Sequence, residues 1–94
     1  MNNLGDVFEK KLAQLRIKKQ INAALICEAF DKAVAEVFGE QGAKNVKAIS
    51  YKNNTLKVGV SSSVWASEIN LRQLELAEDR SMRFIYKQDL HYLR

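Results

Sequence analysis

Apolar residues recur at helical spacing in the first part of the chain. Leu4, Val7, Phe8, Leu12 and Leu15 predict an amphipathic helix over residues 4–15. After a bend at residues 17–20, the same period predicts a second helix over residues 21–38, with an apolar stripe of Ala23, Ile26, Phe30, Ala33, Val34 and Val37. Gly39 and Gly42 are expected to end this helix, because glycine is common just after the last helical turn.

Alternating apolar and polar residues predict strands further along the chain. Two strands are expected over residues 46–51 and 55–60, and the asparagines between them tolerate the positive φ of a hairpin turn. A third strand is expected over residues 82–87, because Met82, Phe84 and Tyr86 alternate with Arg83, Ile85 and Lys87. Between these strands a helix is expected over residues 64–78, and any of the serines at 61–63 could cap it.

This order of elements, helix-helix-strand-strand-helix-strand, is typical of an α+β fold. It predicts a three-stranded sheet with helices packed on one face, in a single domain over residues 1–94. The second strand, third helix and third strand would form a crossover, which should be right-handed if its two strands are parallel neighbours.

Composition narrows the class of protein. A hydrophobic content of 47% fits a small globular domain rather than a disordered segment. The single cysteine, Cys27, excludes an internal disulfide and a cysteine-based zinc site, and it suits a reducing cytoplasm. Because there is no signal-peptide pattern and no apolar run near the ~18 residues of a membrane span, we expect a cytoplasmic protein without membrane contact.

No pattern of residues indicates an enzyme. His91 is the only histidine, the serines at 61–63 have no nearby base, and Cys27 is followed by Glu28, which does not favour a thiolate. The chain has no phosphate-binding glycine string either. We therefore expect a non-enzymatic protein without a cofactor or a metal ion.

Residues 53–76 carry a resemblance to a known family. The string Asn54-Thr55-Leu56-Lys57-Val58 is followed by Ser62-Ser63-Val64-Trp65-Ala66-Ser67-Glu68-Ile69. This pattern resembles that of the DciA family of bacterial proteins, which is associated with loading or operating the replicative DNA helicase. The chain differs from the pattern at Phe30, where tryptophan is common, and in having no proline between Gly39 and Val46.

The resemblance implies a fold similar to type II KH domains, with the usual helix pair reduced to one helix. It also implies a short member of the family, without the flexible C-terminal tail of longer members. The expected partners are then DNA and the replicative helicase.

Basic residues provide the candidate nucleic-acid interface. Five of them lie within ten residues near the N-terminus, without an acid among them, and further lysines follow on or near the hairpin. Lys47 and Lys57 would share one face of the sheet, beside Tyr51, if the register allows. Such a patch can displace counterions from a phosphate backbone, whereas the alternative is an ordinary solvated surface. The predicted nucleic-acid-binding residues are Lys10, Lys11, Arg16, Lys18, Lys19, Lys47 and Lys57.

A second hypothesis uses apolar residues of the third expected helix. Val64, Leu71 and Leu74 lie roughly opposite Ile69 and Ala66 at 100° per residue, where a surface helix is normally polar. They are the predicted contact for a protein partner or a second copy, so that the protein would be an interaction adaptor or a homodimer. Trp65 is expected in the core, and base stacking is the minority interpretation.

A third hypothesis is RNA binding by a KH-like domain. Gly39-Glu40-Gln41-Gly42 has the GxxG spacing of a KH loop, but it is expected to follow a helix and precede a strand, so a helix end explains it better. Tyr51, Phe84 and Tyr86 would be the aromatic residues available for stacking, with Phe84 in the core and the tyrosines half exposed. Weak binding of single-stranded or duplex DNA without sequence preference remains the main expectation.

Overall fold

The computed structural model describes residues 4–69 and 82–88. Its elements, in chain order, are α1 (Leu4–Ile17), α2 (Ala23–Asn45), β1 (Val46–Lys52), β2 (Thr55–Val60), α3 (Ser63–Glu68) and β3 (Arg83–Gln88). This is the predicted order, and the α+β class is confirmed. The part of the predicted third helix beyond Ile69 lies outside the described residues.

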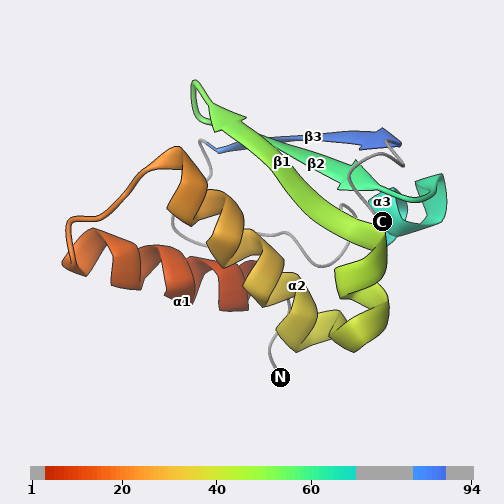
Figure 1. Cartoon of the computed structure of the whole chain (residues 1–94), viewed down its shortest axis with the longest axis horizontal. Coiled ribbons are helices and arrows are strands. Elements are labelled where there is room, and N and C mark those ends of the chain that lie inside the picture. The colour runs from red at the N-terminus through yellow and green to blue at the C-terminus, as the bar shows by residue number, and fades with distance from the viewer. Residues whose placement is uncertain (1–3, 70–81, 89–94) are drawn as a thin grey trace.

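The three strands form one mixed sheet in the order β1-β2-β3. β1 and β2 are antiparallel, whereas β2 and β3 are parallel, so the strands of the predicted crossover are indeed parallel neighbours. Figure 1 shows α1 and α2 together on one side of this sheet. The molecule therefore has a helical layer, a sheet, and an opposite sheet face that neither long helix covers.

The hairpin between β1 and β2 turns through two asparagines. Asn53 has φ 51° and Asn54 has φ 59°, the pair of positive angles that a two-residue type I′ turn requires. The Tyr51 hydroxyl donates to Asn54 Oδ1 at 2.9 Å, and the Arg83 N–H donates to the Asn54 carbonyl oxygen at 2.9 Å. The turn therefore also anchors the beginning of β3.

The two glycines near the end of α2 serve different purposes. Gly39 has φ 71° and ψ −156°, so the helical path breaks there as predicted. The prediction that both glycines end the helix was wrong, because helical structure resumes and continues to Asn45. A Cβ at Gly42 would meet the Phe38 Cβ and would lie 3.1 Å from Val34 Cγ1. Gly42 thus allows the resumed turn to pack closely against the preceding one.

This correction changes the position of the GxxG string. The string begins at the break at Gly39, and its other three residues, Glu40, Gln41 and Gly42, belong to the helical stretch that follows, rather than to a loop between a helix and a strand. Each of its glycines nevertheless has a structural reason, an unusual backbone angle at Gly39 and close packing at Gly42.

The core lies between the helical layer and the inner face of the sheet. Phe8 of α1 meets Phe30 of α2 edge to face at 5.3 Å between ring centroids, and Phe84 of β3 at 6.4 Å. The predicted stripe of α2 is buried or partly buried except for Ala23, which is exposed at the first helical position after the Asn22 cap. The fully buried larger side chains are Phe8, Phe30, Leu4, Leu12, Leu56, Ile69, Val34, Val46, Val58 and Val60.

Tyr86 lies on the inner face, paired with buried Val58. Its hydroxyl is buried and has no hydrogen-bond partner among the described residues, and burial raises the pKa of this hydroxyl. An unpaired buried hydroxyl costs about 1–3 kcal/mol. Tyr86→Phe should therefore raise the free energy of unfolding by about 1–3 kcal/mol, as measured by urea denaturation. A loss of more than about 1 kcal/mol would mean that the hydroxyl has a partner.

Candidate nucleic-acid interface

The strand register defines the residues on the sheet face opposite the helices. In β2, Leu56, Val58 and Val60 are buried, so the alternate residues Thr55, Lys57 and Gly59 point to the other side. Directly paired residues of neighbouring strands lie on the same face. We call this surface the open face, and it comprises Lys47, Ser50, Lys52, Thr55, Lys57, Gly59, Arg83, Ile85 and Lys87.

The nine positions form three rows across the strands. The first row is Lys52, Thr55 and Arg83, the second is Ser50, Lys57 and Ile85, and the third is Lys47, Gly59 and Lys87. Cations therefore occupy the four corners and the centre of the array, and none of the nine residues is acidic. Strands lie about 4.8 Å apart and residues rise about 3.3 Å each, so the array spans roughly 10 by 13 Å.

Two isoleucines accompany these cations. Ile85 is 46% exposed beside Lys57. Ile49 lies at the register shift in β1, and its side chain covers Gly59, with Cδ1 3.1 Å from where a Cβ would stand. The centre of the open face thus combines one lysine with aliphatic surface.

Lys47 and Lys57 lie on the same face, because the register pairs Lys47 with Gly59, which alternates with buried Val58 as Lys57 does. Tyr51 does not lie beside them, because it pairs with buried Leu56 and packs against the core. Phe84 and Tyr86 also pair with buried residues of β2. All three aromatic residues of the sheet therefore face the helices, and Tyr51 and Tyr86 are half-buried on that side.

A carboxylate lies at one border of the open face. Asp31 of α2 accepts a hydrogen bond from the Ala48 N–H at 2.8 Å. Burial raises the pKa of Asp31, while the Ala48 hydrogen bond and the charge of Lys47 act in the opposite direction. Lys47 thus acts electrostatically on Asp31, which belongs to α2 and not to the nine residues of the open face. Two ion pairs join Lys11 to Glu36 and Lys32 to Glu28, and neither of these two involves the open face.

The five predicted basic residues near the N-terminus lie elsewhere, on α1 and the turn after it. Lys10, Arg16, Lys18 and Lys19 are exposed, and Lys19 has φ 55°. Lys11 is half-buried and donates to Glu36 of α2 at 2.8 Å. Because α1 belongs to the helical layer (Figure 1), the structure divides the seven predicted residues between two surfaces.

The predicted contacts left out three cations of the open face: Arg83, Lys87 and Lys52, of which the sequence indicated only that Lys52 lies near the hairpin. Simple alternation along β1 would put Lys47 and Lys52 on opposite faces. They share a face because of the register shift at Ile49, which the sequence did not reveal. The alternation along β3 already indicated the outer face for Arg83 and Lys87, because Phe84 was expected in the core and Tyr86 half exposed. The sequence did not establish that β3 pairs with β2. This pairing brings the two cations beside Lys57.

The predicted protein contact is only partly described. Val64 is 71% exposed in the first turn of α3, whereas Leu71 and Leu74 lie outside the described residues. Trp65 packs edge to face against Phe38 at 5.6 Å, in agreement with the expected core role. Ser62 occupies the cap position of α3 without a side-chain cap bond, and the Ser61 hydroxyl donates to Asn45 Oδ1 at 2.7 Å.

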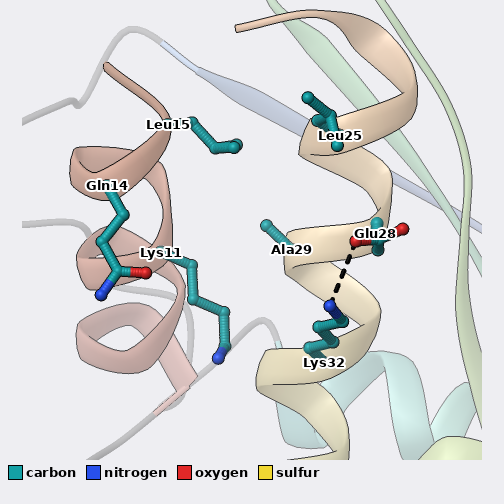
Figure 2. Close-up of a pocket in the computed structure, with 7 residues that line it drawn as sticks. All are labelled: Lys11, Gln14, Leu15, Leu25, Glu28, Ala29 and Lys32. Atoms are coloured by element: carbon teal, nitrogen blue, oxygen red, sulfur yellow. Dashed lines mark ion pairs between the residues drawn. The ribbon is translucent and has the colours of Figure 1, made fainter. Parts of the chain in front are cut away.

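A small pocket lies between α1 and α2 (Figure 2), with a volume of about 150 Å³. Leu15 and Leu25 form its apolar end, and Lys11 reaches into it from α1 toward Lys32. Lys32 pairs with Glu28 at 3.1 Å, and Lys11 is the partner of Glu36. Ligand pockets usually measure about 300–1,000 Å³, so this pocket is too small for a typical substrate.

The described residues offer little for catalysis. Burial, followed by the charge of Asp31, raises the pKa of the Cys27 thiol, which keeps it in its weakly nucleophilic neutral form. Within residues 4–69 and 82–88, no group of three or more histidine, cysteine, aspartate or glutamate side chains is arranged to hold a metal ion. In the same ranges, none of the helices is both long and apolar enough to cross a membrane.

Comparison with known proteins identifies the family. The sequence model of the DciA family, described as "Dna[CI] antecedent, DciA", matches residues 3–84. The chain has no significant match among curated proteins or solved structures. The family match covers most of the 94 residues. It includes α1, α2, β1, β2, α3 and the first two residues of β3, Arg83 and Phe84, and it contains the string that opens α3. The chain therefore belongs to the DciA family.

Proposed function

We propose that this protein is a non-enzymatic nucleic-acid-binding module that acts in the cytoplasm. The DciA family is linked to helicase loading in DNA replication, and it associates with the replicative helicase. The single observation that supports nucleic-acid binding best is the open face, where cations gather without an acid. Its binding would be electrostatic and weakly specific, and the helicase would be its protein partner.

The mechanism requires no chemistry by the protein itself. Exposed lysines and arginines displace the counterions of a phosphate backbone, and the release of these ions drives binding. The proposed contacts are the predicted residues on both surfaces: Lys10, Lys11, Arg16, Lys18, Lys19, Lys47 and Lys57. Lys11 would have to break its ion pair with Glu36 before it could contact a phosphate. We therefore expect Lys11 to contribute less to the affinity than the other six residues.

The first test is a fluorescence-anisotropy titration of labelled single-stranded DNA at about 50 mM and about 200 mM salt. We expect binding at the lower salt concentration and a clear loss of affinity at the higher one. RNA and duplex DNA of the same sequence should be measured alongside, because a preference for RNA would favour the KH-like alternative. If the protein binds none of these polymers at low salt, the proposal is wrong.

An adaptor function is the second candidate, and the 71% exposure of Val64 favours it. Its proposed contact consists of Val64, Leu71 and Leu74. Because apolar contacts are not screened, self-association or helicase binding through them should survive added salt. Sedimentation at both salt concentrations, with Val64→Asp as the variant, distinguishes this candidate from electrostatic binding.

A further inference from the structure

The open face has cations in place of the aromatic side chains that would stack on bases. Proteins that bind single strands usually provide aromatic platforms for bases, together with positive charge for phosphates. Here Tyr51, Phe84 and Tyr86 all lie on the helix-covered side of the sheet. On the other side, apolar side chains of the described strands are those of Ile49 and Ile85.

We propose that the open face binds the phosphate backbone of a nucleic-acid strand and leaves the bases unread. This inference rests on the proposed function and assigns it a location and a ligand group. It adds Lys52, Arg83 and Lys87 to the predicted contacts Lys47 and Lys57. The exposed aliphatic surface at the centre of the array contacts the strand without distinguishing one base from another.

The number of cations sets the salt dependence. Each phosphate contact with a single strand contributes about 0.7 to the slope of log affinity against log salt, so the five contacts of the open face contribute about 3.5 at most. A fourfold rise in salt would then weaken binding by up to about 100-fold. Removing two of the contacts lowers the slope by about 1.4 and reduces that loss to about 20-fold.

Three double variants, each lacking two positive charges, provide the test. Lys57→Gln with Lys87→Gln alters the open face, and Lys18→Gln with Lys19→Gln alters the N-terminal surface. Lys32→Gln with Lys44→Gln is the matched control, because both of these lysines are exposed on α2. Circular dichroism should confirm that each variant is folded.

We expect the open-face variant to bind a labelled oligonucleotide of about 20 nucleotides roughly tenfold or more weakly than the parent at low salt, with the smaller slope. The control variant should bind within about twofold of the parent, because a general change of net charge has little effect without contact. An abasic oligonucleotide of equal length should bind the parent protein as tightly as the normal one.

Other outcomes separate the two proposals. If the parent protein binds DNA but the open-face variant binds equally well, the location is wrong while the proposed function stands. If the abasic strand binds much more weakly, bases are read and the phosphate assignment is wrong. If the parent protein binds no nucleic acid, the proposed function itself fails.

Discussion

Phe30→Ala should lower the free energy of unfolding by about 3–5 kcal/mol. Phe30 is fully buried at the centre of α2 and meets the edge of Phe8 at 5.3 Å, while Phe8 also contacts Phe84. Removing the ring leaves a cavity where α1, α2 and β3 meet. The loss is comparable with the whole stability of many small domains, at about 5–15 kcal/mol, so the variant should be close to unfolding.

Urea denaturation followed by circular dichroism measures this effect. Phe38→Ala is the matched control, because Phe38 is only partly buried and its ring partner is Trp65 at the border of the core. Phe38→Ala should lower the free energy of unfolding clearly less than Phe30→Ala does. Equal losses at the two sites would contradict the placement of Phe30 at the centre of the core.

Gly39→Ala should lower the free energy of unfolding by about 1–3 kcal/mol for a reason unrelated to packing. An added Cβ at Gly39 would meet nothing within 4 Å, so space does not explain the glycine. Its φ of 71° and ψ of −156° lie in a region that only glycine adopts readily. An alanine would either carry this strain or straighten the break in α2.

Gly39→Asn separates this explanation from an ordinary helix end. Asparagine tolerates the left-handed helical region, where ψ is about +45°, but ψ at Gly39 is far from that value. Gly39→Asn should therefore be about as destabilising as Gly39→Ala in the same denaturation experiment. Recovery of stability with asparagine would indicate a simple left-handed cap at this position.

Most of the fold could be predicted because helical spacing of apolar residues and strand-like alternation occur in different segments of the sequence. The alternation of Leu56, Val58 and Val60 gave β2 its bounds, and Asn53-Asn54 indicated the turn. The end of α2 could not be predicted from local rules. Helical structure resumes after Gly39, and Gly42 lies close to Phe38 and Val34 inside the resumed helix, whereas the sequence indicated a second stop there.

The candidate site was less predictable, because it depends on pairing between distant segments. The alternation within single strands predicted one face for Lys47 and Lys57 only on condition of the register, which the structure supplies. Arg83 and Lys87 join them only through the parallel register of β3 with β2. Lys11 shows the opposite effect, since its proximity in sequence to other lysines gave no sign of its ion pair with Glu36, 25 residues away.

The hydrogen bond between Asp31 and Ala48 also affects how the protein behaves at high concentration. β1 lies at the edge of the sheet, and an unpaired edge can template the addition of a strand from another molecule. Asp31 occupies the Ala48 N–H, and the register shift beside it interrupts the regular ladder. A foreign strand would have to displace a carboxylate and straighten the shift. The contact that holds α2 against β1 therefore also protects this edge from aggregation.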